Sequence, residues 1–348
     1  MSALLLRALL HAAALCILIT LLATGLGYGL PSVRLLYYAN QNGNYDIYLL
    51  DTNRLLAAAL TRNPGEDSRP IRSPDGTQIA FFTRHNDQMQ LQVMTSAGRA
   101  KRILAQISGQ IGANPAWSPD GNWIAYSDNS RQRPGIVRVR ADGDEARRIT
   151  DFRADWLAWS PDGLRLAFVA DCDNNCDLYV VNVDGSDLRR LTRNGTFDML
   201  PAWSPDGERL MFMSNRDGYF DLYLIALDCN EHQRGGCPAQ RLTNDRSFDG
   251  YPAWSPDGTR LLFSSDRTGN FDIFTLDTAC LPMPERCEAT LRQLTNQRSS
   301  ERSQVWSPDG DRIAFISAFD LYVMNADGSE QRRMIGGVLP DQVLGWLP

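Results

Sequence analysis

Lysine and histidine are scarce in this chain of 348 residues. Lys101 is the sole lysine, and the three histidines are His11, His85 and His232. An enzyme that forms a Schiff base needs a reactive lysine, so that chemistry is close to excluded. Three scattered histidines also leave little material for histidine-based catalysis or for a metal site built from several histidines.

A surplus of positive charge is missing as well. The formal net charge is −6 at pH 7, and the isoelectric point is about 5.2. Proteins that hold nucleic acid neutralise phosphates with clustered Lys and Arg, so nucleic-acid binding is not expected. The pentapeptide Gly-x-Ser-x-Gly of serine hydrolases is also absent.

Helical periodicity is lacking outside the N-terminus. There, residues 8–30 form an apolar stretch without formal charge, and Arg7 precedes it. Its length suffices to cross a bilayer as a helix. It is either a cleaved signal peptide, with Ala23 and Gly25 as the best small-residue pair, or an uncleaved signal anchor. The anchor is favoured because no clean Ala-x-Ala box is present. Both interpretations assign residues 1–33 to export or anchoring and place the remainder outside the cytoplasm.

Six of the seven cysteines fall into three close pairs, and the seventh is Cys16 in the apolar stretch. The pairs are Cys172 with Cys176, Cys229 with Cys237, and Cys280 with Cys287. Local pairs beyond an export segment predict disulfides in an oxidising compartment. Zinc is the alternative, but these spacings do not match zinc knuckles and no histidine accompanies them.

The tetrapeptide Ser-Pro-Asp-Gly recurs along the chain and defines an internal repeat. Its copies begin at Ser73, Ser118, Ser160, Ser204, Ser255 and Ser307, at intervals of 42 to 52 residues. Each precedes two short runs of strand-forming residues separated by polar turns, a pattern that indicates a β-propeller. Pro, Asp and Gly suit a type I turn with a glycine bulge, so the repeated Asp side chains are interpreted as parts of hairpins.

Two incomplete units at the ends of the repeat region complement each other. Residues 35–61 match strands 2, 3 and 4 of a unit, whereas residues 343–348 match a strand 1 alone. Together they predict an all-β, seven-bladed propeller over residues 34–348, closed by exchange of terminal strands. A six-bladed ring is the alternative. An indole recurs on strand 1 (Trp117, Trp159, Trp203, Trp254, Trp306 and Trp346), is replaced by Arg72 in one unit, and is expected to pack between blades.

The motifs Pro-Ala-Trp-Ser-Pro-Asp-Gly, Asp-Leu-Tyr or Asp-Ile-Phe on the third strand, and Asn-Ala-Asp-Gly-Ser at 325–329 resemble the WD40-like PD40 repeats of the TolB family. The resemblance covers about residues 34–348. It implies a propeller that binds proteins in the periplasm, whereas the separate N-terminal α/β domain of TolB has no counterpart here. The repeats are also similar to those covering prolyl oligopeptidase-type peptidases, but the hydrolase domain of that family has no match.

Acidic residues recur five positions before the strand 1 tryptophan or its equivalent. They are Asp67, Asp198, Asp249, Glu301 and Asp341, whereas Gly112 and Ala154 interrupt the series. Equivalent positions form a circle in a closed ring, so these carboxylates are candidates for binding a cation or a basic segment of a partner. The alternative is that each bonds its own crossover backbone, which the recurrence favours.

Two further loop features are candidate sites. The acidic loop with Asp171, Asp173 and Asp177 has oxygen ligands that suit Ca²⁺, but it lacks the Gly and terminal Glu of an EF-hand. The segments around Cys229–Cys237 and Cys280–Cys287 lengthen two neighbouring loops on the opposite face. They form either a partner-binding patch or tolerated insertions.

These patterns predict a non-enzymatic, extracytoplasmic propeller that binds a protein or peptide partner at the cell envelope. We expect a monomeric ring without a cofactor, tethered to the membrane by its N-terminal segment or secreted after cleavage. The alternative is an enzyme acting on a sugar or lactone through carboxylates and a metal at the channel mouth, a chemistry that fold analogy alone cannot select.

Overall fold

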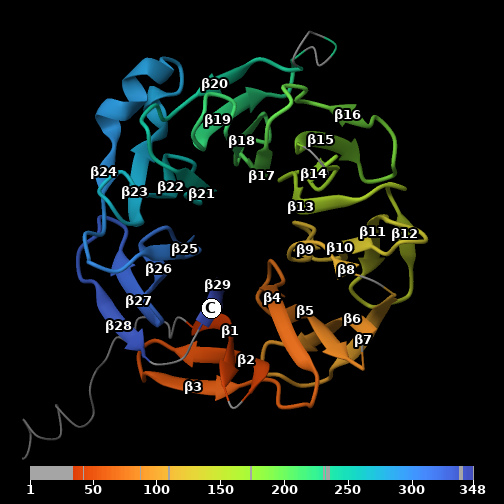
Figure 1. Ribbon diagram of the computed structural model, residues 1–348. Coiled ribbons are helices and arrows are strands. Elements are labelled where there is room, and N and C mark those ends of the chain that lie inside the picture. Colours follow the sequence, from red (N-terminus) through yellow and green to blue (C-terminus); the bar gives the residue numbers. More distant parts are fainter. Residues whose placement is uncertain are drawn as a thin grey trace, which may run out of the picture.

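The computed structural model describes residues 34–347, with gaps at 42, 87, 109, 173–174, 230–231, 233–235 and 337–339. Seven four-stranded antiparallel blades surround a central opening, which confirms the predicted seven-bladed ring (Figure 1). The apolar stretch at residues 8–30 lies outside the described residues. Within the described ranges, no helix has the length and apolar character needed to span a bilayer.

The blades are numbered here along the chain, and their strands follow the repeat. Blade 1 contains β29 (Pro340–Leu347), β1 (Arg34–Gln41), β2 (Asn44–Asp51) and β3 (Leu56–Ala59), and blade 2 contains β4 (Glu66–Arg72), β5 (Gln78–His85), β6 (Gln88–Thr95) and β7 (Arg102–Ile107). Blade 3 contains β8 (Gln110–Ile111), β9 (Ala116–Trp117), β10 (Trp123–Asn129), β11 (Gly135–Arg140) and β12 (Ala146–Arg148). Blade 4 contains β13 (Ala154–Trp159), β14 (Arg165–Ala170), β15 (Asp177–Asn182) and β16 (Arg189–Arg190). In blade 3, both β8 and β9 pair with β10, so strand 1 is split in two.

Blades 5 to 7 follow the same order. Blade 5 contains β17 (Asp198–Trp203), β18 (Arg209–Ser214), β19 (Asp221–Ala226) and β20 (Ala239–Arg241). Blade 6 contains β21 (Asp249–Trp254), β22 (Arg260–Ser265), β23 (Asp272–Asp277) and β24 (Arg292–Gln293). Blade 7 contains β25 (Glu301–Trp306), β26 (Arg312–Ser317), β27 (Asp320–Asn325) and β28 (Arg332–Ile335). Two 3-10 helices, η1 (Thr278–Cys280) and η2 (Pro284–Thr290), lie between β23 and β24.

Strand exchange closes the ring as predicted. The C-terminal β29 pairs antiparallel with β1 and supplies strand 1 of blade 1. Trp346 on β29 is almost completely buried and packs in a core cluster with Leu35 and Tyr37 of β1 and Ile316 of blade 7. The strand β29 therefore joins the two ends of the chain, and its Trp346 fills the interface between blades 7 and 1.

The Ser-Pro-Asp-Gly segments form the hairpins between strands 1 and 2, as expected. In the copy at Ser204, the N–H of Gly207 donates to the Ser204 carbonyl, and Gly207 has φ +71°. The Ser204 hydroxyl accepts from the N–H of Arg209, and Asp206 accepts from the N–H of Glu208. These local bonds account for the recurrence of both the serine and the aspartate.

The strand 1 tryptophans pack between blades, and five of them bond the preceding blade. The indole N–H of Trp159 donates to the Ala116 carbonyl of blade 3 at 2.9 Å, and Trp203 donates to the Ala158 carbonyl of blade 4 at 3.0 Å. Trp117, Trp254 and Trp346 make the equivalent bond. The Trp306 indole nitrogen has no hydrogen-bond partner in the described part of the chain.

This difference yields a first prediction. Trp159→Phe keeps an aromatic ring at the half-buried position but removes one interblade hydrogen bond, so we expect a loss of about 1 kcal/mol in the free energy of unfolding. Trp306→Phe is the matched control, because it removes an indole N–H that has no such partner, and its loss is expected to be smaller. Chemical denaturation of both variants checks the order, and equal losses would contradict it.

The ring has two ends that carry different loops. The crossover end carries the connections from strand 4 of one blade to strand 1 of the next, among them residues 60–65, 149–153, 191–197, 242–248 and 294–300, together with the hairpins between strands 2 and 3. The Ser-Pro-Asp-Gly end carries the hairpins between strands 1 and 2 and between strands 3 and 4. Antiparallel pairing within every blade places these loop types at opposite ends of the strands.

Candidate functional site

Strand 1 of most blades bulges toward the central channel near the crossover end. The register between strands 1 and 2 shifts at one place in blades 2, 4, 5, 6 and 7. A residue three positions before the strand 1 tryptophan, or before Arg72, has positive φ between +48° and +56° there. These residues are Arg69, Trp156, Leu200, Tyr251 and Ser303. Bulges and left-handed non-glycine residues concentrate at functional sites.

Three of these bulge residues line a cavity of about 260 Å³ at the channel, together with prolines from the same strands. Trp156, Leu200 and Tyr251 give it an apolar wall, and Asn114 and Gln304 add polar groups from the neighbouring blades. Tyr251 is 53% exposed. We define these five residues as the channel mouth. Its members come from five consecutive blades, four of them from strand 1 and Asn114 from the break between β8 and β9.

Hydrogen bonds and aromatic contacts hold Tyr251 in place. The Gln304 amide donates to the Tyr251 carbonyl at 2.9 Å and accepts from the Ser264 hydroxyl at 2.8 Å. The Phe248 ring lies 6.2 Å from the Tyr251 ring and 5.4 Å from that of Phe220. The exposed tyrosine is therefore backed by a rigid support, which limits the entropy lost when a ligand contacts it.

The predicted circle of carboxylates lies inside the blades. Asp67, Asp198, Asp249 and Glu301 have no solvent exposure, and the side chain of Asp341 falls outside the described residues. Asp67 accepts from the Thr83 hydroxyl at 2.6 Å and the Asn63 amide at 2.7 Å. Asp198 accepts from the Asn194 amide and from Arg216. Asp67 and Asp198 thus bond side chains of their own crossovers, Asn63 and Asn194, where the alternative expected bonds to the crossover backbone, and a role in binding stays a prediction.

A second set of acidic residues starts strand 3 and pairs with strand 4. Asp221 accepts from the Thr243 hydroxyl and from Arg241 at 2.6 Å. Asp177 makes the same two bonds with Thr192 and Arg190. Burial raises the pKa of Asp221 to about 6, although Arg241 opposes the shift.

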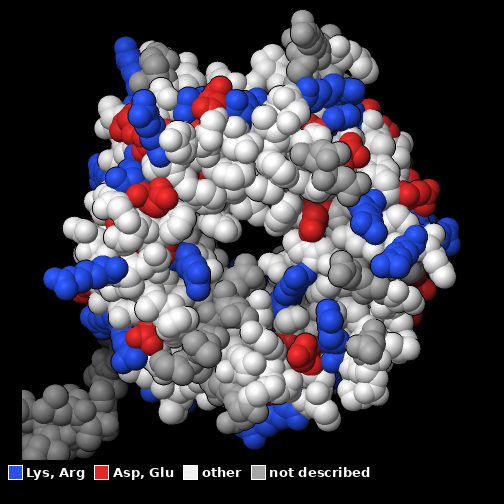
Figure 2. Space-filling model, in the orientation of Figure 1, with Lys and Arg blue, Asp and Glu red and all other residues white. Residues whose placement is uncertain are grey.

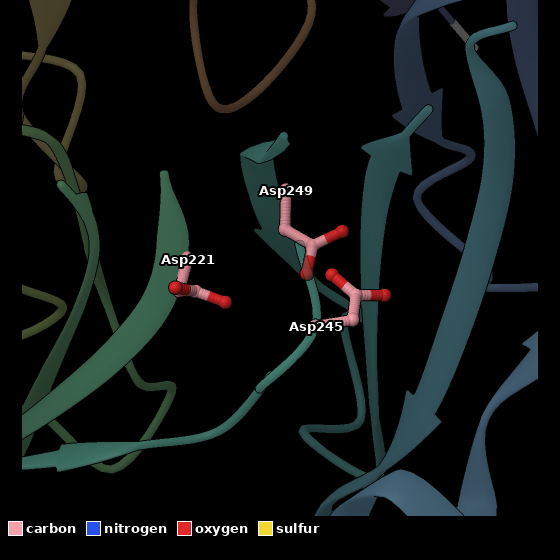
Figure 3. Close-up of side chains that lie close together, drawn as sticks. All are labelled: Asp221, Asp245 and Asp249. Carbon is pink, nitrogen blue, oxygen red and sulfur yellow. The ribbon is translucent and has the colours of Figure 1, made fainter. Parts of the chain in front are cut away.

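Asp221, Asp245 and Asp249 form the one cluster of potential metal ligands found among the described residues, with carboxylate oxygens within 4.8 Å of one another (Figure 3). Arg267 Nη2 lies 3.1 Å from Asp245 and 3.0 Å from Asp249, and Arg241 pairs with Asp221. The two guanidinium groups already supply the positive charge that a cation would bring. The arrangement accordingly forms an ion-pair network between blades 5 and 6.

The predicted calcium loop is only partly described. Asp171 accepts from the Tyr179 hydroxyl, Asp177 is buried against Arg190, and Asp173 lies outside the described residues. The Cys172–Cys176 disulfide closes this loop, and all three predicted disulfides are present. Calcium binding there stays a prediction.

The two disulfide-closed insertions contact neighbouring elements. Cys237 N–H donates to the Leu191 carbonyl of blade 4 at 2.7 Å, so the Cys229–Cys237 segment joins blades 4 and 5. After the Cys280–Cys287 disulfide, Glu288 of η2 pairs with Arg267 at 2.9 Å. Arg267 belongs to a hairpin of the crossover end, so η2 spans the outer edge of blade 6 instead of staying at the Ser-Pro-Asp-Gly end.

Glu301 leads to a pH prediction. Burial raises its pKa to about 7; a hydrogen bond from Ser317 opposes the shift and the nearby Asp272 adds to it. The folded protein retains this proton between the ordinary pKa of 4.5 and about 7, whereas the unfolded chain loses it. Stability therefore falls as pH rises through that window. Glu301→Gln should raise the melting temperature at pH 8 by at least about 2 °C relative to its effect at pH 5.

The matched control for Glu301→Gln is Asp257→Asn in a Ser-Pro-Asp-Gly turn. Hydrogen bonds from Ser255 and Thr259 lower the pKa of Asp257 to about 2. Its charge is the same at pH 5 and pH 8, so the effect of the substitution should not change between them. Thermal melts of both variants at the two pH values check the prediction, and a Glu301→Gln effect that is independent of pH contradicts it.

Comparisons with known proteins agree with the fold. PD40, the TolB β-propeller domain, matches residues 31–156 and 115–239. The Tol-Pal system protein TolB of Anaeromyxobacter dehalogenans strain 2CP-C is 36% identical over 99 residues, which are 27% of this chain and 21% of that protein. The match thus spans about a fifth of the relative's length.

Two solved structures share the architecture at low identity. TolB from Acinetobacter baumannii aligns with a TM-score of 0.55 at 20% identity, over 91% of this chain and 83% of that chain. An oligogalacturonate lyase in complex with manganese aligns with a TM-score of 0.63 at 18% identity, over 82% of each chain. At these identities the likeness concerns the fold. With PD40 matched over more than half of its length, the chain belongs to the TolB β-propeller domain family.

Proposed function

We propose that this protein is a non-enzymatic scaffold outside the cytoplasm that binds a protein or peptide partner at its crossover end. The observation that carries the proposal is the channel mouth, where the exposed Tyr251 stands beside Trp156 and Leu200 on bulged strands. Exposed aromatic residues on a rigid support are typical of binding hot spots. The Tol-Pal system name of the relative gives independent support for an assembly at the cell envelope.

Location and tethering are part of the same proposal. Three disulfides support an oxidising compartment outside the cytoplasm. The apolar residues 8–30 would tether the ring to the membrane or direct its export. A monomeric ring leaves the crossover end open to a partner.

The second candidate function is an enzyme acting on a sugar or lactone. Its support is the shared fold with an oligogalacturonate lyase and the presence of the Asp221–Asp245–Asp249 cluster. The ion pairs with Arg241 and Arg267 weigh against a catalytic metal at this cluster.

Affinity capture from crosslinked envelope extract tests the binding function. The full chain with Tyr251→Ala is compared with a matched control, Leu164→Ala, which removes another exposed apolar side chain at the Ser-Pro-Asp-Gly end. We expect a protein retained by the wild type and the control, with retention reduced at least about tenfold by Tyr251→Ala. Equal capture by both variants contradicts the proposed site. Formation of an unsaturated product from oligogalacturonate would instead favour the enzyme.

A further inference from the structure

Exposed arginines ring the crossover end, in contrast to the buried carboxylates. Five crossovers each carry one at their surface, namely Arg62, Arg153, Arg193, Arg246 and Arg298. We call these residues the arginine circle. None of them forms an ion pair with a carboxylate in the described ranges. Their charge is therefore available to a ligand.

More positive charge flanks the channel itself. Arg302 is exposed on β25, and Arg69 is half-buried on β4. Figure 2 shows Lys or Arg side chains on both sides of the central opening, over these two strands, and an acidic side chain at the upper right of the opening. Among the acidic residues described at this end, exposed Asp171 and Asp217 already lie within 4 Å of Arg190 and Arg241. Glu66 and Asp151 are also exposed there, exposed Glu288 pairs with Arg267, and Asp155 on β13 is half-buried.

The Ser-Pro-Asp-Gly end has the opposite character. All six aspartates of the repeated turn are exposed at that end: Asp75, Asp120, Asp162, Asp206, Asp257 and Asp309. The chain as a whole carries a net charge of −6. The exposed positive charge at the crossover end is therefore a local property of that surface, and it would attract an acidic ligand there.

We infer that the partner presents an acidic peptide segment whose carboxylates meet the arginine circle and whose apolar side chain enters the channel mouth. This inference rests on the proposed binding function and adds the chemistry of the partner. The cavity of about 260 Å³ has room for an apolar anchor side chain beside Trp156, Leu200 and Tyr251. Arginine pairs with carboxylates in a two-pronged geometry, which makes the circle suited to Asp and Glu side chains.

Fluorescence anisotropy with a defined probe tests this inference. The probe is a labelled peptide of about twelve residues in which Glu alternates with Gly around a central Phe, and its twin carries Gln in place of Glu. The full chain is studied as wild type and as the variant R62Q/R193Q/R246Q/R298Q. The matched control R54Q/R99Q/R147Q/R332Q removes the same charge from exposed positions at the Ser-Pro-Asp-Gly end. All eight positions are exposed, so folding is expected to persist and is verified by circular dichroism.

The acidic peptide should bind wild type and control alike, and the crossover variant at least about tenfold more weakly at low salt. Equal binding of the Gln twin, or equal weakening by both variants, overturns the inference. Binding of oligogalacturonate in place of the peptide also overturns it and favours an acidic sugar. If affinity capture through Tyr251 succeeds while the acidic peptide fails to bind, the proposed function stands and the acidic partner is wrong. Failure of the capture itself counts against the proposed function.

Discussion

Removal of residues 340–348 is expected to abolish cooperative folding of the ring at physiological temperature. The deletion takes away β29, exposes the hydrogen-bonding edge of β1 and removes the buried Trp346 from the core shared by blades 7 and 1. Loss of a buried tryptophan alone costs about 3–5 kcal/mol, and an open edge invites aggregation. A thermal melt followed by circular dichroism measures the effect, and we expect a drop on the order of 10 °C or more.

Adding the missing strand as a separate peptide distinguishes loss of β29 from a general effect of truncation. A synthetic peptide with the sequence of residues 338–348 should restore stability to the shortened chain, because it can occupy the place of β29. The same peptide with Trp346→Ala should restore much less. A shortened chain that melts at the wild-type temperature would contradict closure by strand exchange.

Arg267→Met is expected to produce the largest loss among single substitutions in the crossover loops. The guanidinium contacts Asp245, Asp249 and Glu288 within about 3 Å, and its Nε donates to the Ser265 hydroxyl. Without it, the fully buried Asp249 loses its cation. Breaking a buried ion pair by removing one partner costs about 3–5 kcal/mol.

The pH dependence of this variant gives a sharper test. Burial already raises the pKa of Asp249 above its ordinary value, and loss of Arg267 should raise it further. Protonation then relieves the uncompensated charge, so the deficit in the free energy of unfolding should shrink as pH falls from 8 to 5. The control is Arg332→Met, because Arg332 pairs with Glu330 at the exposed surface and such pairs contribute about 0–1 kcal/mol. Similar losses in both variants would contradict the network.

The repeat made much of the fold predictable from sequence. The spacing of Ser-Pro-Asp-Gly located the hairpins, and the complementary end units predicted the strand exchange that the structure shows. The interblade role of the tryptophans also followed, because an indole that recurs at the start of six blades has a large apolar ring to cover and one donor to satisfy. The donor's target, a carbonyl of the preceding blade, depends on how blades stack and could not be read from one repeat.

The candidate site was harder to predict, since exposure and backbone conformation decide it. Recurrent acids five positions before the tryptophan suggested a charged circle, yet the structure buries Asp67, Asp198 and Asp249. The positions three before the tryptophan vary in type, from Arg69 to Tyr251, so the pattern concealed their common left-handed conformation. Arginines such as Arg62 and Arg193 follow the Leu-Thr pair just after strand 4. Their positions in the repeat could have predicted a basic crossover end.

The central claim is that partners bind at the crossover end, and site-specific photo-crosslinking tests it most directly. A benzophenone amino acid is placed at position 251 of the full chain, or at position 164 as the control at the Ser-Pro-Asp-Gly end. Both positions are exposed. The account predicts a covalent adduct from position 251 in intact cells, mapped by mass spectrometry to a segment rich in Asp and Glu, with none from position 164. An adduct from position 164 alone would contradict it.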